Sequence, residues 1–296
     1  MQSERMNLAA NELTHRVRGH FKTDWQREIF DAAVESFDHE DSPLRLKNFA
    51  SALRELGRIG LGLLAPKKKI RACEWFEQNT HVREEGGVTR AQRAKYAVQG
   101  ELHDEFVLEY LHIDVQSTVK EYLALIDELN EYGHTIEESF DTPAKSAELE
   151  AIRALESFDQ LSGLIQERHA SLLSSAADAA RHFVTSELLR EADEELDRLP
   201  THFSVGDYHL DSLLVLSLSP DRILYQGRGR IYVRRQFEWN SAVAWDDVAV
   251  VLDVCPFECS LEATTSYPLS TSFVRRSMKI DIDIYDNDIP DRVHEK

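Results

Sequence analysis

The sequence predicts an α+β protein, in which an N-terminal all-helical bundle is followed by a C-terminal antiparallel β-rich sandwich or small barrel. Apolar residues recur at steps of three and four from Ala9 to about Leu199, which is the spacing of one helix face. After Pro200 the pattern changes to short apolar runs separated by turn residues, which is typical of strands. A chain of 296 residues is long enough for two cores, so we expect domains at residues 1–200 and 201–296.

Within the helical region, a long helix is predicted over Leu46–Leu64 because the apolar spacing is regular and a proline lies beyond each end. Three glycines near its end lower the helix propensity but permit close packing: Gly57, Gly60 and Gly62. The polar run over residues 78–89 indicates a loop, and a further helix is expected to begin at Arg90.

The most regular helix follows Asp114, whose side chain is placed to cap the first turn, and Gly133 is placed to end it. Its apolar face is marked by Val115, Val119, Tyr122, Leu123, Ile126 and Leu129. Two more helices are predicted over Ala147–Leu173 and Ala176–Leu199, after which Pro200 ends the helical pattern.

The C-terminal region contains short strands with turn residues between them. The almost wholly apolar run Val248–Val254 predicts a strand in the middle of a sheet. In the last strand, apolar and polar side chains alternate, so that Met278, Ile280, Ile282 and Ile284 share the inner face. No long helical pattern separates the strands, which favours antiparallel pairing.

The composition restricts the location and the partners. The longest apolar stretch is too short to span a bilayer and the first residues lack a signal-peptide core, so we expect a cytoplasmic protein without membrane association.

The net charge of −19 opposes nonspecific attraction to nucleic acid. Residues 43–100, however, carry 12 lysines and arginines against 5 acidic residues, and therefore form a basic segment within an acidic chain. This segment offers one surface for an anionic partner, although a solvated helix surface is an equal alternative.

Common catalytic patterns are missing from the sequence, including phosphate-binding Gly-rich loops, serine-hydrolase elbows and zinc-binding pairs of cysteines. Cys255 and Cys259 lack the second pair that structural zinc needs, and with Cys73 they are expected to be free thiols. Asp281 and Asp283 share a strand face, and paired carboxylates of this kind can hold a divalent ion for metal-assisted hydrolysis. Acidic residues that alternate on an outer face are, however, more typical of a solvated surface. We therefore predict no metal and no cofactor.

One arrangement is compatible with metal-free RNA cleavage. This chemistry needs a base for the 2′-hydroxyl and a cation for the phosphate. His134 directly follows the end of the most regular helix, and Arg54 or Arg58 from the helix over residues 46–64 can supply the cation. A histidine at a helix end is more often a cap or a surface group, which is the competing interpretation.

Several segments resemble bacterial proteins described as predicted nucleases that associate with prokaryotic PIWI systems. The segments are Asn48–Leu56, Leu64–Pro66 with Trp75 and Phe76, Val88–Gly100, and Glu128–His134. The resemblance implies a role in bacterial conflict or anti-phage defence, in which the helical part acts on or binds nucleic acid. The helical part is also similar to the HEPN class of ribonuclease bundles, although the arginine that this class has four to six intervening residues before its histidine is missing before His134, where Asn130 stands in the preceding turn.

Two classes of function remain open at this stage. The first is a nuclease, including a metal-independent ribonuclease, with Arg54, Arg58, Asn130 and His134 as the catalytic candidates. The second is a noncatalytic nucleic-acid-binding or adaptor subunit of a defence complex, whose acidic surfaces contact a partner protein. In both classes the nucleic acid, RNA or DNA, is expected on Lys67, Lys68, Lys69, Arg71, Arg90 and Arg93. The β-rich domain would serve recognition or assembly, and a homo-oligomer is compatible with either class.

Overall fold

The computed structural model describes residues 8–39, 44–78, 87–133, 144–197, 203–236, 250–274 and 277–281. The chain divides into two compact units, Met1–Leu172 and Leu173–Lys296, which we call the helical unit and the sheet unit. The described elements confirm the predicted α+β class, with helices first and an antiparallel sheet after them. The predicted domain limit at residue 200 stays a prediction. No helix in the described ranges is long and apolar enough to cross a membrane.

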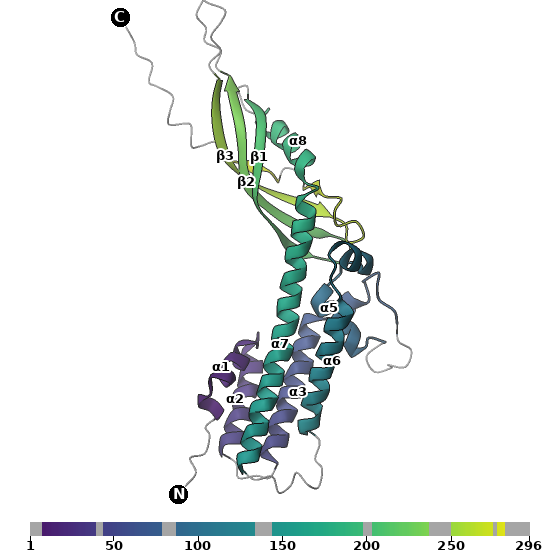
Figure 1. Ribbon diagram of the computed structural model, residues 1–296, viewed down its shortest axis with the longest axis vertical. Coiled ribbons are helices and arrows are strands. Elements are labelled where there is room, and N and C mark those ends of the chain that lie inside the picture. The colour runs from purple at the N-terminus through teal and green to yellow at the C-terminus, as the bar shows by residue number, and fades with distance from the viewer. Residues whose placement is uncertain are drawn as a thin grey trace, which may run out of the picture. The chain divides into compact units, whose positions relative to one another are not determined.

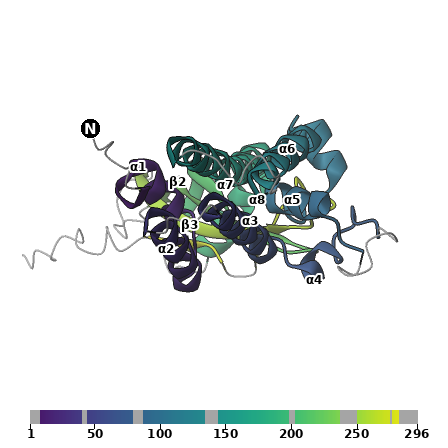
Figure 2. The same cartoon turned by 90° about the horizontal axis from the view of Figure 1, so that it is seen from below.

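The helical unit is built around long helices that run side by side (Figures 1 and 2). Its elements are η1 (Leu8–Ala10), α1 (Glu12–Gly19), α2 (Asp24–His39), α3 (Arg45–Leu64), α4 (Lys67–Ile70), α5 (Arg90–Gln99), η2 (Phe106–Tyr110), α6 (Val115–Gly133) and the first part of α7 (Ala144–Arg181). The predicted cap of α6 is confirmed, since Asp114 accepts a hydrogen bond from the Ser117 amide. At the start of α5, Thr89 and Gln92 form a capping box that the sequence analysis did not single out.

The core of this unit is rich in aromatic side chains. Phe21 packs against Phe30 and Phe158 with ring centroids 5.2 and 5.5 Å apart, and Phe37 packs against Phe49 at 5.5 Å. Such pairs stabilise a fold by about 1 kcal/mol beyond their buried area. These contacts join the α1–α2 connection to α2 and α7, and α2 to α3.

The glycines of α3 do not end the helix, which continues to Leu64. A methyl group on Gly57 would stand 3.4 Å from a ring carbon of Phe158, so this glycine permits the close approach of α7 that its sequence position suggested. Gly60 and Gly62 have more room, with their nearest neighbours at 3.9 Å.

One predicted break is wrong. The helices expected over Ala147–Leu173 and Ala176–Leu199 meet without interruption across residues 174–175, because α7 runs to Arg181. The buried residues on both sides of that point keep one helical phase: Leu172, Ala176, Ala177 and Ala180. The chain leaves the helix at residues 182–184, before α8 (Thr185–Leu196).

The sheet unit contains β1 (Phe203–Leu218), β2 (Ile223–Gln236), β3 (Val250–Ala263), β4 (Ser272–Phe273) and β5 (Lys279–Ile280) (Figure 1). The order is β1-β2-β3-β4, β5 also pairs with β3, and every pairing is antiparallel. In the described ranges these strands form a single sheet that α8 contacts, instead of the two layers of a sandwich or a closed barrel.

One-sided burial is clearest in the two central strands. The residues at odd-numbered positions are buried in β2 (Ile223 to Val233) and in β3 (Asp253 to Ala263), whereas their neighbours are partly or fully exposed. Val250–Val254 lies in β3, but this part of the strand pairs only with β2 in the described ranges, because β5 and β4 pair with β3 further along, at Phe257–Glu258 and Leu261–Glu262; the predicted central position is therefore wrong for Val250–Val254. At the last predicted strand, Met278 is buried and Lys279 is exposed; Ile282, Asp283 and Ile284 lie outside the described residues.

Candidate functional site

A groove of about 380 Å³ lies between α3, α5 and α6 of the helical unit. Each helix contributes side chains at helical spacing, so that one face of each points to the same space. Arg54 and Arg58 come from α3 and Arg90 and Arg93 from α5, while α6 contributes Tyr122, Ile126 and Asn130. We call this cavity the arginine groove. It brings together five of the residues that the sequence singled out: Arg54, Arg58, Arg90, Arg93 and Asn130.

The charge of the arginine groove is positive, since Glu55 is the one acidic residue among its described lining residues. Glu55 accepts two hydrogen bonds from Arg58, at 2.9 Å from Nε and 2.5 Å from Nη2. The hydrogen bonds from Arg58 lower the pKa of Glu55, so the carboxylate is ionised at neutral pH. Arg93 donates from Nη1 to the Ala65 carbonyl at 3.0 Å, which holds its guanidinium against the end of α3.

Tyr122 is a groove residue that the sequence analysis treated as part of an apolar stripe. Its side chain is almost fully buried, and burial raises its pKa to about 12, while the charge of Arg90 acts in the opposite direction. The phenol is therefore neutral and can donate a hydrogen bond. Its hydroxyl has no hydrogen-bond partner among the described residues and is not sealed from solvent. The only hint in the sequence was a single tyrosine within an otherwise aliphatic face.

The two remaining catalytic candidates lie at the end of α6. Asn130 is half-buried at the groove, one helical turn beyond Ile126. His134 follows the last residue of α6, Gly133, and lies outside the described residues. The structure thus places the predicted cations and Asn130 together, and the role of His134 stays a prediction.

The predicted lysine surface lies on a different part of the helical unit from the groove lining. Lys67, Lys68 and Lys69 form most of α4, and all three are exposed, as is Arg71 directly after it. Lys69 is 3.9 Å from the carboxylate of Glu101, whereas no ion pair of Lys67 or Lys68 occurs among the described residues. A row of like charges on one short helix suits contact with a phosphate backbone.

Partly buried polar contacts join α5 to the segment that follows it, and they were not expected from the sequence. Tyr96 donates to Glu101 at 2.5 Å, and Lys95 donates to Asp104 at 2.6 Å while its ammonium lies 4.3 Å from the Trp75 ring centroid. Burial, together with the hydrogen bond to Glu101, raises the pKa of Tyr96 well above its usual range. Such contacts are missed by sequence reasoning because a lysine in a helix is expected at the surface.

The structure also bears on the metal and cysteine candidates. Among the described residues, no group of three or more histidine, cysteine or acidic side chains is arranged to hold a metal ion. Cys255 and Cys259 are buried free thiols, and burial raises the pKa of Cys259 to about 12. Asp281 is exposed after β5, while Asp283 lies outside the described residues.

The fold and the groove define an α+β protein with a helical unit in which arginines from two helices line one groove. Residues 18–158 match a family model described as a predicted pPIWI-associating nuclease, and residues 165–285 match a second model with the same description. The two matches cover nearly the whole chain, and the protein therefore belongs to the predicted pPIWI-associating nuclease family. No curated protein and no solved structure matches the chain.

Proposed function

We propose that the helical unit binds nucleic acid with its phosphates in the arginine groove and cleaves it without a metal ion. The observation that carries this proposal is the convergence of four arginines from two helices on one groove of about 380 Å³. Arginine is suited to phosphate because its guanidinium stays charged and donates from a planar fork. The family description adds a nuclease activity that is itself a prediction about the family.

The proposed reaction is the internal cleavage of RNA. His134 takes the proton of the 2′-hydroxyl, whose oxygen attacks the phosphorus while Arg54 and Arg58 stabilise the pentavalent phosphate. The bond from phosphorus to the 5′-oxygen breaks, and that oxygen takes a proton from water. The products are a 2′,3′-cyclic phosphate and a 5′-hydroxyl end. Tyr122, as a neutral hydroxyl in the groove, donates a hydrogen bond to a phosphate oxygen.

The wider role follows from the family description. We propose that the protein acts in a bacterial conflict or anti-phage system, with a prokaryotic PIWI protein as its partner. In this proposal the sheet unit serves recognition or assembly, and the similarity of the helical unit to HEPN ribonuclease bundles reflects the shared use of metal-free chemistry. Cytoplasmic location and a homo-oligomeric state belong to the same proposal.

A second candidate function is binding without cleavage. Arg58 bonds to Glu55 and Arg93 bonds to the Ala65 carbonyl, so two of the four groove arginines also hold the protein's own groups. Guanidinium groups held in this way can position a bound nucleic-acid strand, but they contribute less to stabilising the charge that develops in the transition state. The protein would then be an adaptor that presents nucleic acid to a catalytic partner.

One experiment separates these functions. Purified protein is incubated with end-labelled RNA and DNA of the same sequence, with magnesium or with EDTA, and both cleavage and retention on a filter are measured. Cleavage of RNA that persists in EDTA and leaves cyclic phosphate ends supports the proposed reaction. Retention without cleavage supports the adaptor. Cleavage that EDTA abolishes and that requires Asp281 or Asp283 assigns the chemistry to the sheet unit and contradicts the proposal.

A further inference from the structure

A second cavity, of about 100 Å³, lies in the helical unit where the α1–α2 connection meets α2, α3, α6 and α7. Its walls are mainly apolar and include Phe21, Leu56, Leu61, Phe158, Leu161 and Ile165. An apolar cavity of about 150 Å³ is known to bind benzene, and this cavity is smaller but of the same order of magnitude. Leu61 and Tyr122 line both this cavity and the arginine groove, so the two cavities share a wall.

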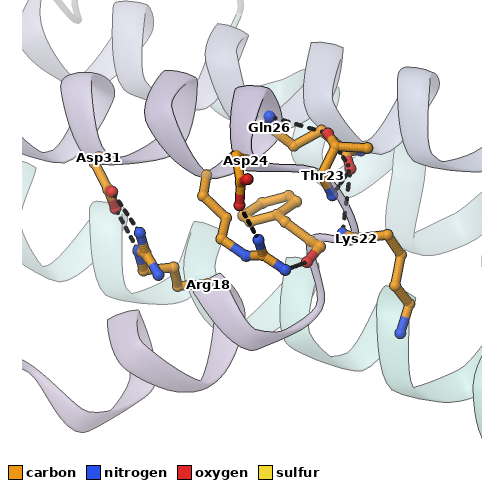
Figure 3. Close-up of polar contacts among 8 residues, drawn as sticks. Arg18, Lys22, Thr23, Asp24, Gln26 and Asp31 are labelled. Carbon is orange, nitrogen blue, oxygen red and sulfur yellow. Dashed lines mark hydrogen bonds and ion pairs between the residues drawn. The ribbon is translucent and has the colours of Figure 1, made fainter.

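A buried glutamine directs hydrogen-bond donors into this cavity. The Gln26 side chain is 2% exposed, and its Oε1 accepts hydrogen bonds from the Lys22 amide, the Thr23 amide and the Thr23 hydroxyl at 3.1–3.2 Å (Figure 3). Three donors to one atom identify it as the oxygen, so the other amide atom is the NH₂ group. That nitrogen has no partner among the described residues, and it lies 3.9 Å from the position of a methyl group on Gly60, which also lines the cavity.

The imidazole of His20, which also lines the cavity, is held in one orientation. Its Nε2 lies 2.7 Å from Asp159 Oδ1, and Arg16 donates to the other oxygen of the same carboxylate at 2.7 Å. Partial burial acts to raise the pKa of Asp159, but the hydrogen bonds from His20 and Arg16 outweigh it and the pKa lies below its ordinary value. An ionised carboxylate at Nε2 keeps the proton there, so Nδ1 is the acceptor in the neutral ring.

From these observations we propose that this cavity, the Gln26 pocket, binds one uncharged six-membered ring that carries a carbonyl group, as in a pyrimidine base. The carbonyl oxygen accepts from the Gln26 amide, and the ring packs against the apolar walls. A charged ligand is disfavoured because most of the wall offers no compensation for lost hydration. The site does not depend on cleavage in the arginine groove, and the ring can belong either to a free compound or to a nucleotide of a bound strand.

The test uses uracil as the probe, titrated into the full chain and followed by NMR. We expect saturable binding that weakens at least tenfold in Gln26→Glu, which retains the acceptor for Lys22 and Thr23 but replaces the NH₂ group with an oxygen. We expect a similar loss in Gly60→Ala, whose methyl group enters the pocket at ordinary contact distance and therefore permits folding. Gly163→Ala is the matched control, since it changes a helical glycine that does not line the pocket.

Two results would overturn the proposal: no saturable uracil binding to the folded native chain, or equal uracil affinity in the native chain, Gln26→Glu and Gly60→Ala. The source of the ring is decided by comparing an oligouridylate with an abasic strand of the same length. Tighter binding of the oligouridylate that Gly60→Ala abolishes supports a nucleotide of a bound strand. Equal binding of the two strands, with uracil still bound, supports a free compound. Either result leaves the cleavage assay to be judged separately.

Discussion

The helical unit and the sheet unit differ in what their polar side chains contact. In the helical unit, the Tyr122 hydroxyl and the Gln26 amide nitrogen face cavities and have no partner among the described residues. On the exposed face of the sheet, Arg228 bonds to Glu258 on the neighbouring strand at 2.8 Å, and Arg230 bonds to Asp211 at 2.9 Å. Cross-strand pairs of this kind stabilise a sheet. All four residues also line a cavity of about 600 Å³. The two units therefore differ in whether the polar groups at a cavity are already paired within the protein.

The two units also differ in the tolerance of their glycines. In the helices, a methyl group on Gly60 or Gly163 would meet only atoms at 3.9 or 4.0 Å. In β2, a methyl group on Gly229 would stand 2.2 Å from the His209 carbonyl oxygen and 2.7 Å from the Phe257 ring. A methyl group therefore has room at these two helical positions, whereas at Gly229 it would meet β1 and Phe257, although this glycine also lines a cavity of the sheet unit.

The largest expected effect tests the assignment of chemistry to the helical unit. Because Arg54 and His134 act on the same phosphate in the proposed reaction, replacing either with alanine should slow RNA cleavage by about a thousandfold, or about 4 kcal/mol. The rate is measured with end-labelled RNA in EDTA. Arg228→Ala in the sheet unit also removes an exposed arginine and should leave the rate unchanged. An equal loss in Arg228→Ala, or full activity in His134→Ala, would contradict the assignment.

The next effect concerns the closed packing of the sheet. Gly229→Ala should destabilise the protein by about 3 kcal/mol, because β1 and the Phe257 ring must both move to admit a methyl group. Gly163→Ala in α7 should instead stabilise it by up to about 1 kcal/mol, since alanine is the better helix former. Thermal unfolding followed by circular dichroism measures both variants. If both changed stability in the same direction, the difference between the units would be lost.

A smaller effect is expected at the lysine surface of α4. Replacing Lys67, Lys68 and Lys69 together with alanine should weaken nucleic-acid binding roughly tenfold for all sequences, because contacts with phosphates carry charge but no sequence information. The slope of log affinity against log salt concentration should fall by about 2, as expected for three lost phosphate contacts on a single strand. Filter binding at several salt concentrations gives both quantities. An unchanged slope would exclude this surface.

The smallest effect is a loss of stability when an aspartate is replaced with asparagine, and it should depend on how buried the aspartate is. Asp159→Asn should cost about 1 kcal/mol at neutral pH by weakening the hydrogen bonds with His20 and Arg16. Since the folded-state pKa of Asp159 is lowered, this stabilisation is present above the ordinary pKa of aspartate, about 4, and is lost as the pH falls through the folded-state pKa. Urea unfolding between pH 7 and pH 2 should show the two proteins converging. Asp211→Asn should change stability less, because Asp211 is 45% exposed compared with 20% for Asp159.

Much of the architecture was predictable because its signals are local. The apolar period, the capping residue Asp114 and the change of pattern after Pro200 each act over a few residues, and they predicted the order of the helical region and the strands. The predicted break near residues 174–175 is wrong because it, too, was inferred from a local signal. Helix propensity is lower at these residues, but the buried residues of α7 keep their helical spacing across them, and packing keeps the helix intact.

By itself, the sequence determined the order of secondary structure, the basic segment over residues 43–100 and the identity of the arginines worth considering. Only the tertiary structure decided that Arg54 and Arg90 line one groove and that Lys67 does not line it. It also decided that Tyr122 and Gln26 present polar atoms to cavities. The physical reason is that helical period defines which residues share a face, but the packing of distant helices decides what that face meets.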